Sequence, residues 1–439
     1  MKKILAILMA AMMTATAFAG CNKGGDASSE GSGDTPTDIA AVEGSIVDVS
    51  YFGDEGADGS AIKLKVWAPD ATVNLVKKQI EDFKAAYPDK TFEIEVVAQG
   101  ESDAATQLLN DASVAADVFS IPSDQLNGLV EAGVIAEVAF KDAVIAANSE
   151  DTIKAGTLND TLYAYPETND NGYYLVYDNT VVTAEDAKTL EGTLAACKKA
   201  NKKFIMDAGN GFYSCVFAFT AGVKIDGFEE DGMTQKFTDY DEDTAVKTLQ
   251  AFARLIKEYK GTFQSLDVSN ISSGFSSGTC GAGVDGSWDT ASNQEALGDK
   301  FGAAKLPTIN VDGTDTQLVS MFGYKYIGVN GSSAYPASAQ ILAHYLAGEE
   351  CQLSRAQELG WGPSNKNVQQ NEVVTGSPVL TAIGEQANNA CVQVNLASTF
   401  WDPMGNLGNK LIADDWDPED AEATKKLLND TIVNIRDEG

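Results

Sequence analysis

The 439-residue sequence predicts an α/β protein with two domains. From about residue 61, segments with the apolar alternation of strands take turns with segments that have the three-to-four spacing of amphipathic helices. The connections between these segments are short, which favours an open, mostly parallel sheet with helices on both faces. Hydrophobic residues make up 44% and charged residues 22% of the chain, which are ordinary values for a globular protein, and the length suits two or three domains or one large one.

The first elements alternate between strand and helix. The apolar residues from Val73 to Tyr87 recur at steps of three and four, and Pro88 ends this helix. Phe92, Ile94 and Val96 alternate with acids, as in a half-buried strand. We predict strand 64–67, helix 73–87, strand 92–97, a helix capped by Ser102, strand 117–119 and helix 124–132.

The same order returns in the second half of the chain. Asp243 is placed to cap a helix that Gly261 ends, and Gly348 follows another helix. Periodicity leaves open how many times the chain crosses between the domains. We predict strands 173–177, 203–206 and 324–329, and helices 243–260, 336–347 and 419–435.

The N-terminus has the pattern of an export signal. In residues 1–20, two lysines precede a short apolar run that is followed by small residues. Cleavage has two candidate places: Ala17-Phe18-Ala19, or the sequence before Cys21, which resembles a bacterial lipobox. The residues after Cys21 are rich in Gly, Ser and Asp, a composition typical of a linker. We therefore interpret Cys21 as a lipid anchor and residues 21–60 as the anchor and a flexible tether.

Composition excludes several classes of function. The formal charge of −33 argues against nucleic acid, because phosphate recognition requires Lys and Arg. A single His and three Arg leave little room for Ser-His-Asp catalysis or for anion clamps. Apart from Cys21, the five cysteines form no CxxC pair and are expected to be isolated, buried thiols. The sequence predicts no catalytic residue, no cofactor and no metal site.

Three motifs resemble reactive sites, and each has a simpler explanation. Residues 281–286 match G-x-G-x-x-G, but a Ser/Gly-rich segment precedes them in place of a strand. The acidic run 239–243 begins like a calcium loop, yet Thr244 and Gln250 stand where such a loop needs Gly and Glu. His344 lies in an apolar helix and is expected to be packed. Paired carboxylates leave glycoside hydrolysis open as an alternative.

The tryptophans indicate a sugar site. Trp288, Trp361 and Trp401 are predicted at junctions between loops and regular elements, where binding sites concentrate. An aromatic ring packs against the C–H face of a sugar, while acids and amides bond its hydroxyl groups. Packing alone is an equally good explanation for any one of these residues.

Six segments of the chain are specific in their order and spacing: LKVWAPD, IEDFKAAYPD, ADVFSIPSDQLNGLVEAGVI, YAYPETNDNGYYLVYDN, GAGVDGSW and TFWDPMGN. Through these segments, residues 61–439 resemble the extracellular solute-binding proteins of ABC importers, in particular the maltose/maltodextrin-binding branch. The resemblance implies a two-lobed α/β periplasmic-binding-protein-like fold with a multi-strand hinge and a ligand cleft between the lobes. By this analogy lobe 1 is 61–170 plus 315–360, and lobe 2 is 171–314 plus 361–439.

The resemblance also implies ligand contacts at particular positions. Gln125 stands where some relatives have Arg, and Asn171 stands near the position of an expected acid, with Asp170 the other candidate. Trp361 has no counterpart in the family and is added for its position in the sequence. The expected ligand-binding residues are Asp70, Asp124, Gln125, Asn171, Tyr213, Trp288, Trp361 and Trp401.

The implied function is capture rather than catalysis. A monomeric, lipid-anchored bacterial protein outside the cytoplasmic membrane would bind a neutral oligosaccharide, most simply a maltooligosaccharide, and deliver it to ABC permease subunits. A carboxylate-dependent glycosidase and a surface carbohydrate-binding protein without a role in transport remain the alternatives.

Overall fold

The computed structural model describes residues 44–231 and 234–436 of the chain. The predicted export signal, Cys21 and the first part of the predicted tether lie outside the described residues. Within the described part, no helix is both long enough and apolar enough to cross a membrane.

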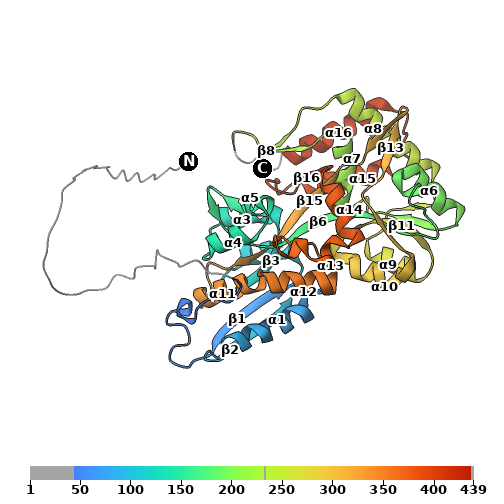
Figure 1. The fold of residues 1–439 in the computed structure, drawn as a ribbon. Helices are drawn as coiled ribbons and strands as arrows, with labels where there is room; N and C mark the ends of the chain where they lie inside the picture. Colours follow the sequence, from blue (N-terminus) through green and yellow to red (C-terminus); the bar gives the residue numbers. More distant parts are fainter. Residues whose placement is uncertain (1–43, 232–233, 437–439) are drawn as a thin grey trace, which may run out of the picture. The chain divides into compact units, whose positions relative to one another are not determined.

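One mixed sheet of ten strands organises the fold (Figure 1). Its strands follow the order β10-β7-β11-β6-β15-β3-β1-β2, with β12 beside β6 and β16 beside β15. The bounds are β1 Ile62–Ala68, β2 Phe92–Ala98, β3 Val118–Pro122, β6 Tyr165–Asp178, β7 Lys203–Ile205, β10 Phe263–Gln264, β11 Cys280–Gly286, β12 Phe301–Ala304, β15 Ser320–Val329 and β16 Ala390–Val392. We call the part around β1, β2 and β3 the first lobe, and the part around β7, β10 and β11 the second.

The expected, mostly parallel sheet is found only within each lobe. β1 pairs in parallel with β2 and β3, and β7 pairs in parallel with β10 and β11. The long central strands β6 and β15 are antiparallel to each other, and they also pair antiparallel with β11 and β3, respectively. The prediction failed at the centre because strand direction depends on how the chain crosses between the lobes, which local periodicity does not encode.

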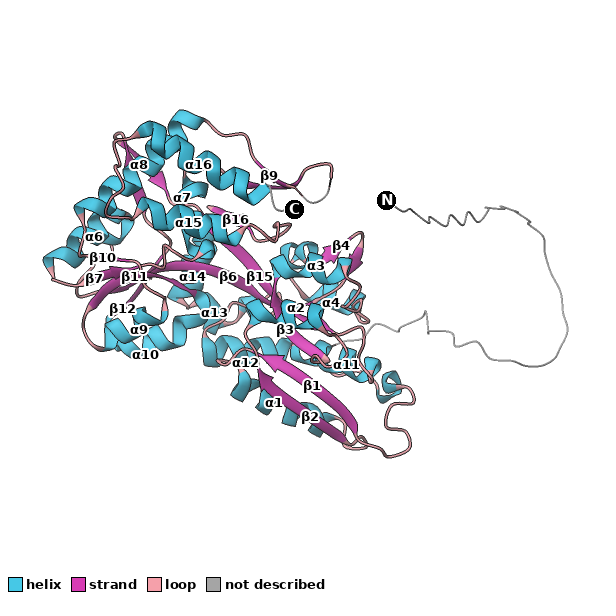
Figure 2. Ribbon diagram, turned by 180° about the vertical axis from the view of Figure 1, so that it is seen from behind, coloured by secondary structure: helices cyan, strands magenta, loops and turns pink. Residues whose placement is uncertain are grey.

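Helices pack against the sheet in both lobes (Figure 2). In the first lobe Phe83 of α1 and Leu342 of α11 join Leu64 of β1 and Ile327 of β15 in one buried core. The helices of this part are α1 Val73–Ala86, α2 Glu101–Asn110, α3 Leu126–Glu131, α4 Lys141–Ala147, α5 Glu150–Ala155, α11 Pro336–Leu346 and α12 Glu349–Leu359. His344 is buried in α11, as expected, and one of its ring nitrogens lies 3.0 Å from the carbonyl oxygen of Gly44.

The folded region begins earlier than the predicted tether boundary at residue 60. Val49–Phe52 forms a short 3-10 helix, and the Phe52 side chain is fully buried against Tyr87 and Phe92. The Glu55 carboxylate accepts hydrogen bonds from the backbone N–H groups of Ala337 and Ser338 at the start of α11. The Gly- and Asp-rich composition that suggested a tether instead forms turns here, because isolated apolar residues between them reach the core.

The second lobe has its own core, in which Leu249 and Phe252 of α8 meet Phe217 of α7 and Leu407 of α15. The N-cap of α8 is Asp241, whose carboxylate accepts a hydrogen bond from the Thr244 N–H, rather than the predicted Asp243. The five described cysteines are free and buried, as expected. The helices are α6 Leu190–Lys199, α7 Gly211–Thr220, α8 Glu242–Glu258, α9 Ser269–Ser276, α10 Thr290–Leu297, α13 Glu372–Thr375, α14 Pro378–Ala387, α15 Trp401–Leu411 and α16 Ala421–Arg436.

Among the described residues, three two-stranded hairpins lie outside the main sheet. They are β4 Thr157–Leu158 with β5 Thr161–Leu162, β8 Ile225–Phe228 with β9 Gln235–Phe237, and β13 Thr308–Val311 with β14 Thr314–Gln317.

Candidate functional site

A cavity of about 1250 Å³ receives residues from both lobes and from the central strands. Pro69 and Asp124 follow β1 and β3 in the first lobe, and Trp288 follows β11 in the second. These segments leave the carboxyl ends of parallel strands, which is where open α/β sheets place their ligands. The fold therefore supplies a ligand-sized cavity at the position that its topology favours.

A chain of acid and amide groups forms the polar part of this cavity. The Gln393 side-chain amide donates to Asp124 Oδ1 at 2.8 Å, and its carbonyl oxygen accepts from Asn171 Nδ2 at 2.8 Å. The backbone of Gln393 is also held in place. Its N–H donates a hydrogen bond to the Phe322 backbone carbonyl, and its backbone carbonyl accepts one from Ser123 Oγ. These hydrogen bonds fix the orientation of both amide groups and of the Asp124 carboxyl group, which also has a hydrogen bond with the Trp401 side chain.

Three aromatic side chains of the second lobe form the apolar part. Phe212 lies 5.8 Å from Trp288 and 6.2 Å from Trp401 between ring centroids, and all three line the cavity. Two glycines make this packing possible. A Cβ on Gly286 would lie 2.2 Å from the Trp288 ring, and a Cβ on Gly211 would lie 2.3 Å from the Trp401 carbonyl oxygen. These glycines thus allow the backbone to approach both tryptophans closely.

Asp170 holds two tryptophan-bearing segments in place from the central strand β6. Its carboxylate accepts a 2.6 Å hydrogen bond from the N–H of Gly362, next to Trp361. Its carbonyl oxygen accepts from Ser287 Oγ, next to Trp288. Because side chains alternate along a strand, Asp170 and Asn171 point to different sides, and only Asn171 lines the cavity.

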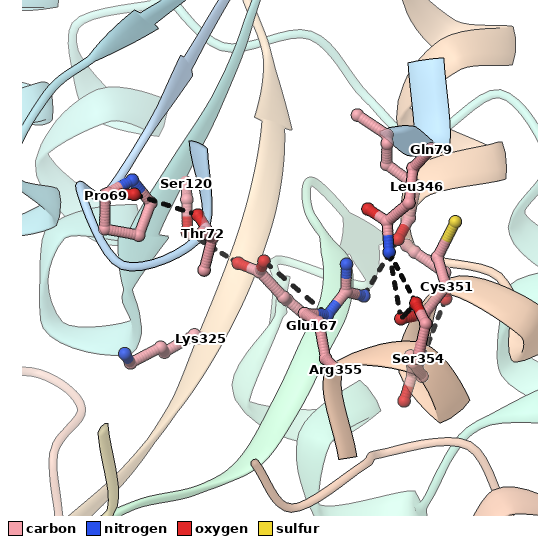
Figure 3. A network of polar contacts seen from close by, with 12 residues as sticks. Pro69, Thr72, Gln79, Ser120, Glu167, Lys325, Leu346, Cys351, Ser354 and Arg355 are labelled. Carbon is pink, nitrogen blue, oxygen red and sulfur yellow. Dashed lines mark hydrogen bonds and ion pairs between the residues drawn. The ribbon is translucent and has the colours of Figure 1, made fainter. Parts of the chain in front are cut away.

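Beside the cavity lies a network of buried charges (Figure 3). Glu167 is 4% exposed, and it accepts a hydrogen bond of 2.5 Å from Ser120 Oγ. The guanidinium of Arg355 lies 3.9 Å from Glu167 and donates to the Leu346 carbonyl at 2.8 Å. Burial raises the pKa of Glu167, while Arg355 acts in the opposite direction. The network fixes β6 to α12, which carries the chain toward Trp361.

The structure brings six of the eight expected residues to the cavity wall. Asp70 is exposed at the turn after β1, where its neighbours Pro69 and Ala71 line the cavity in its place. Tyr213 is 3% exposed and lies behind Phe212, with 6.5 Å between its ring and that of Trp288. The six lining residues are Asp124, Gln125, Asn171, Trp288, Trp361 and Trp401.

Sequence reasoning missed several lining residues. Phe212 is next to the expected Tyr213, and the helical rotation of α7 places it on the cavity side. Gln393 comes from a distant segment and carried no local signal. Lys325 carried a local signal, because a lysine within an otherwise uncharged, fully buried strand needs an ionic partner. The missed residues with polar or aromatic side chains include Glu101, Phe212, Asp289, Lys325, Gln393 and Asp402.

Asp124 should make stability depend on pH. Burial raises its pKa from 3.8 to about 7, although the hydrogen bond from Gln393 favours the carboxylate. Between these two values the folded state keeps a proton that the unfolded state releases, so the contribution of Asp124 to the free energy of unfolding falls as pH rises from about 4 to 7. Urea unfolding across this range measures the effect. The free energy of unfolding of wild type minus that of Asp124→Asn should fall as the pH rises.

The variant Asp402→Asn controls for this experiment, because it removes the same charge from an exposed position on the same cavity. If wild type and Asp124→Asn follow parallel pH profiles, Asp124 does not titrate in this range.

Comparison with known sequences decides the family. A family model described as bacterial extracellular solute-binding protein matches residues 78–382, which is more than half of the chain. This chain belongs to that family. The resemblance inferred from the sequence motifs is thereby confirmed. The family and the structural relatives of this solute-binding protein are binding proteins, and the family is extracellular.

Individual relatives cover most of this solute-binding protein. The galactooligosaccharide-binding protein of Bacillus subtilis (strain 168) is 23% identical over 372 residues, which are 82% of this chain and 86% of the relative. A maltodextrin-binding protein from L. casei BL23 superposes with a TM-score of 0.72 at 26% identity, over 86% of this chain and 99% of that one.

The maltotriose-binding protein of Thermus thermophilus has the same fold, with a TM-score of 0.71 at 20% identity over 85% of this chain and 99% of that chain. The predicted two-lobed fold class is confirmed.

Proposed function

We propose that this solute-binding protein captures neutral oligosaccharides, with maltooligosaccharides the first candidates, and delivers them to the permease of an ABC importer. The observation that carries the proposal is that one cavity combines aromatic faces with an ordered chain of acid and amide groups. Phe212, Trp288 and Trp401 offer surfaces on which sugar rings stack, and Asp124 and Asn171 offer hydrogen bonds to hydroxyl groups.

The size of the cavity supports a ligand of several sugar units, because about 1250 Å³ exceeds the range of roughly 300–1,000 Å³ that is usual for small-molecule pockets. The names of the relatives support the same class, since they bind galactooligosaccharide, maltodextrin or maltotriose.

Transport requires that the ligand bind a closed arrangement of the lobes more tightly than an open one. We take the lobes as 61–170 plus 315–360 and 171–314 plus 361–439, with residues 44–60 added to the first on the basis of their packing. The central strands β6 and β15 would then be the hinge, because they pair with each other, while β6 also pairs with β11 of the second lobe and β15 with β3 of the first. We also propose that Cys21 carries lipid and that the segment between it and residue 44 connects a monomer to the membrane.

A thermal-shift screen tests the proposal. Maltotriose, xylotriose and galactotriose at 100 times the Kd would each stabilise the folded state by about 2.7 kcal/mol if bound, and we expect at least one to raise the Tm by several degrees. X-ray scattering should then show that the same sugar makes the protein more compact.

Each alternative predicts a different result. A glycosidase would convert the sugars into shorter products on prolonged incubation, which chromatography would detect. A surface protein without a transport role would bind without becoming more compact. A protein that is stabilised by none of the neutral sugars would contradict the proposal.

A further inference from the structure

Lys325 is a buried cation at the surface of the cavity that neither the family resemblance nor the motif analysis assigned to a role. It lies in β15, all of whose residues are buried, and it is 3% exposed while it still lines the cavity. β15 pairs Lys325 with Pro122 of β3 and with Thr168 of β6, so the side chain starts from the middle of the sheet. Burying a charge there is costly unless it is paired, which implies that the position has a use.

Carboxylates already balance the charge of this ammonium group. Glu101 Oε2, at the N-terminal end of α2, lies 2.9 Å from Lys325 Nζ. Burial by itself lowers the pKa of Lys325, but Glu101, Asp170 and Glu167 outweigh burial, and the net shift is upward from 10.5. Ser120 Oγ lies 2.9 Å from Glu101 Oε1 and 2.5 Å from Glu167 Oε2, so its hydroxyl group stands between the two acids and helps to fix their positions. Lys325 therefore stays charged at any physiological pH.

Two tryptophans cover the same ammonium group. Lys325 Nζ lies 4.1 Å from the centroid of the Trp361 ring and 5.5 Å from that of Trp288. In Figure 3 the Lys325 side chain points away from Glu167 and Arg355. Contacts of this kind stabilise a desolvated cation and hold it in one place. Trp361 is 2% exposed and its ring lies against the ammonium group of Lys325, so little of the indole face is free for a sugar.

An ammonium group has three N–H donors, and the ion pair with Glu101 engages one of them. A sugar unit that stacks on Trp288 would place its hydroxyl groups within reach of the others. The carboxylate of an acidic sugar would be attracted by Lys325 but repelled by the surrounding negative charge, because the cavity is lined by five acids and a single lysine. The acids are Glu101, Asp124, Glu131, Asp289 and Asp402.

We propose that Lys325 is a specificity-determining residue of this site, which donates a hydrogen bond to a hydroxyl group of the bound sugar and, because its charge is already balanced, favours neutral over acidic sugars. The inference rests on the proposed function and names one residue that sets its ligand class.

The first test is the variant Lys325→Met, which keeps the length of the side chain and removes the ammonium group. Calorimetry with the most stabilising of the three neutral trisaccharides should show at least tenfold weaker binding than for wild type. The variant Lys63→Met is the matched control, because it removes an ammonium group from an exposed ion pair with Glu93, outside the cavity. The double variant Glu101→Gln/Lys325→Met removes the carboxylate that Lys325→Met alone would leave unpaired. It should bind the sugar as weakly as Lys325→Met, even if it is more stable than that variant.

The second test separates a direct contact from a structural role. Analogues of the same trisaccharide that each lack one hydroxyl group are titrated into wild type and into Lys325→Met. If Lys325 donates to the sugar, one analogue loses affinity against wild type but loses none against the variant. If every analogue loses the same factor against both proteins, the contact is refuted and only a structural role is left.

The third test concerns charge. A trisaccharide with one sugar unit oxidised to its uronic acid should bind wild type at least tenfold more weakly than the neutral form, and equal affinity would overturn the selectivity. If wild type and Lys325→Met bind the neutral trisaccharide equally well, this inference is overturned and the proposed function stays intact. Wild type that binds no neutral trisaccharide overturns both.

Discussion

Replacing either Trp288 or Trp401 by Ala is expected to weaken oligosaccharide binding at least tenfold, which corresponds to about 1.4 kcal/mol. Each ring is half-buried at the cavity wall and in contact with Phe212, so that part of its surface is free to stack on a sugar. Stacking both removes apolar surface from water and positions the hydroxyl groups for Asp124 and Asn171. The double variant should lose binding by a hundredfold or more if the two rings contact different sugar units. Isothermal titration with the best trisaccharide measures these losses.

The variant Trp416→Ala is the control for the loss of an indole ring, because Trp416 packs against the core of the second lobe and does not line the cavity. It should bind the sugar with wild-type affinity under conditions in which it is folded. Unchanged affinity in both Trp288→Ala and Trp401→Ala would place the ligand elsewhere.

The second large effect concerns stability. Replacing Arg355 by Met should lower the free energy of unfolding by about 3–5 kcal/mol, because it leaves the buried Glu167 carboxylate without its cation. Arg355 is 1% exposed, so water cannot take over its role. The loss should be larger at pH 8 than at pH 5. Without Arg355 the already raised pKa of Glu167 rises further, so that at low pH the carboxyl group takes up a proton and becomes neutral. Urea unfolding at the two pH values measures both effects.

The double variant Glu167→Gln/Arg355→Met supplies the control for this prediction. It removes both charges, so it should be more stable than Arg355→Met alone and should lose the extra dependence on pH. If the double variant is the less stable of the two, the damage comes from lost packing or from the lost hydrogen bond to Leu346 rather than from an unpaired charge.

Local sequence patterns predicted many elements well. The helix expected at 73–87 is α1 Val73–Ala86, and the strand expected at 92–97 is β2 Phe92–Ala98, because in both segments the apolar spacing is regular and the ends carry clear signals. The pattern failed at residues 272–280, where a Ser/Gly-rich segment suggested a loop. They form part of helix α9 and the start of β11, whose Gly283 packs so closely against Ile271 and Ile205 that a Cβ there would lie within 3.0 Å of both.

The candidate site was predicted in part for a related reason. Trp288, Trp401 and Asp124 were found because they lie in motifs that resemble a known family, and the structure places all three at one cavity. The motifs did not predict which side of a helix or a turn faces this cavity. Tyr213 is therefore buried behind Phe212, and Asp70 points into solvent between two lining residues.

By itself the sequence determined the α/β class, the resemblance to solute-binding proteins and the aromatic and acidic character of the site, since composition, periodicity and ordered motifs are properties of the chain alone. Only the tertiary structure decided the antiparallel centre of the sheet, the Asp124–Gln393–Asn171 chain and the position of Lys325 between Trp288 and Trp361. These depend on contacts between segments up to 269 residues apart. Such contacts are set by how the chain crosses between lobes and by which charges must be paired once buried.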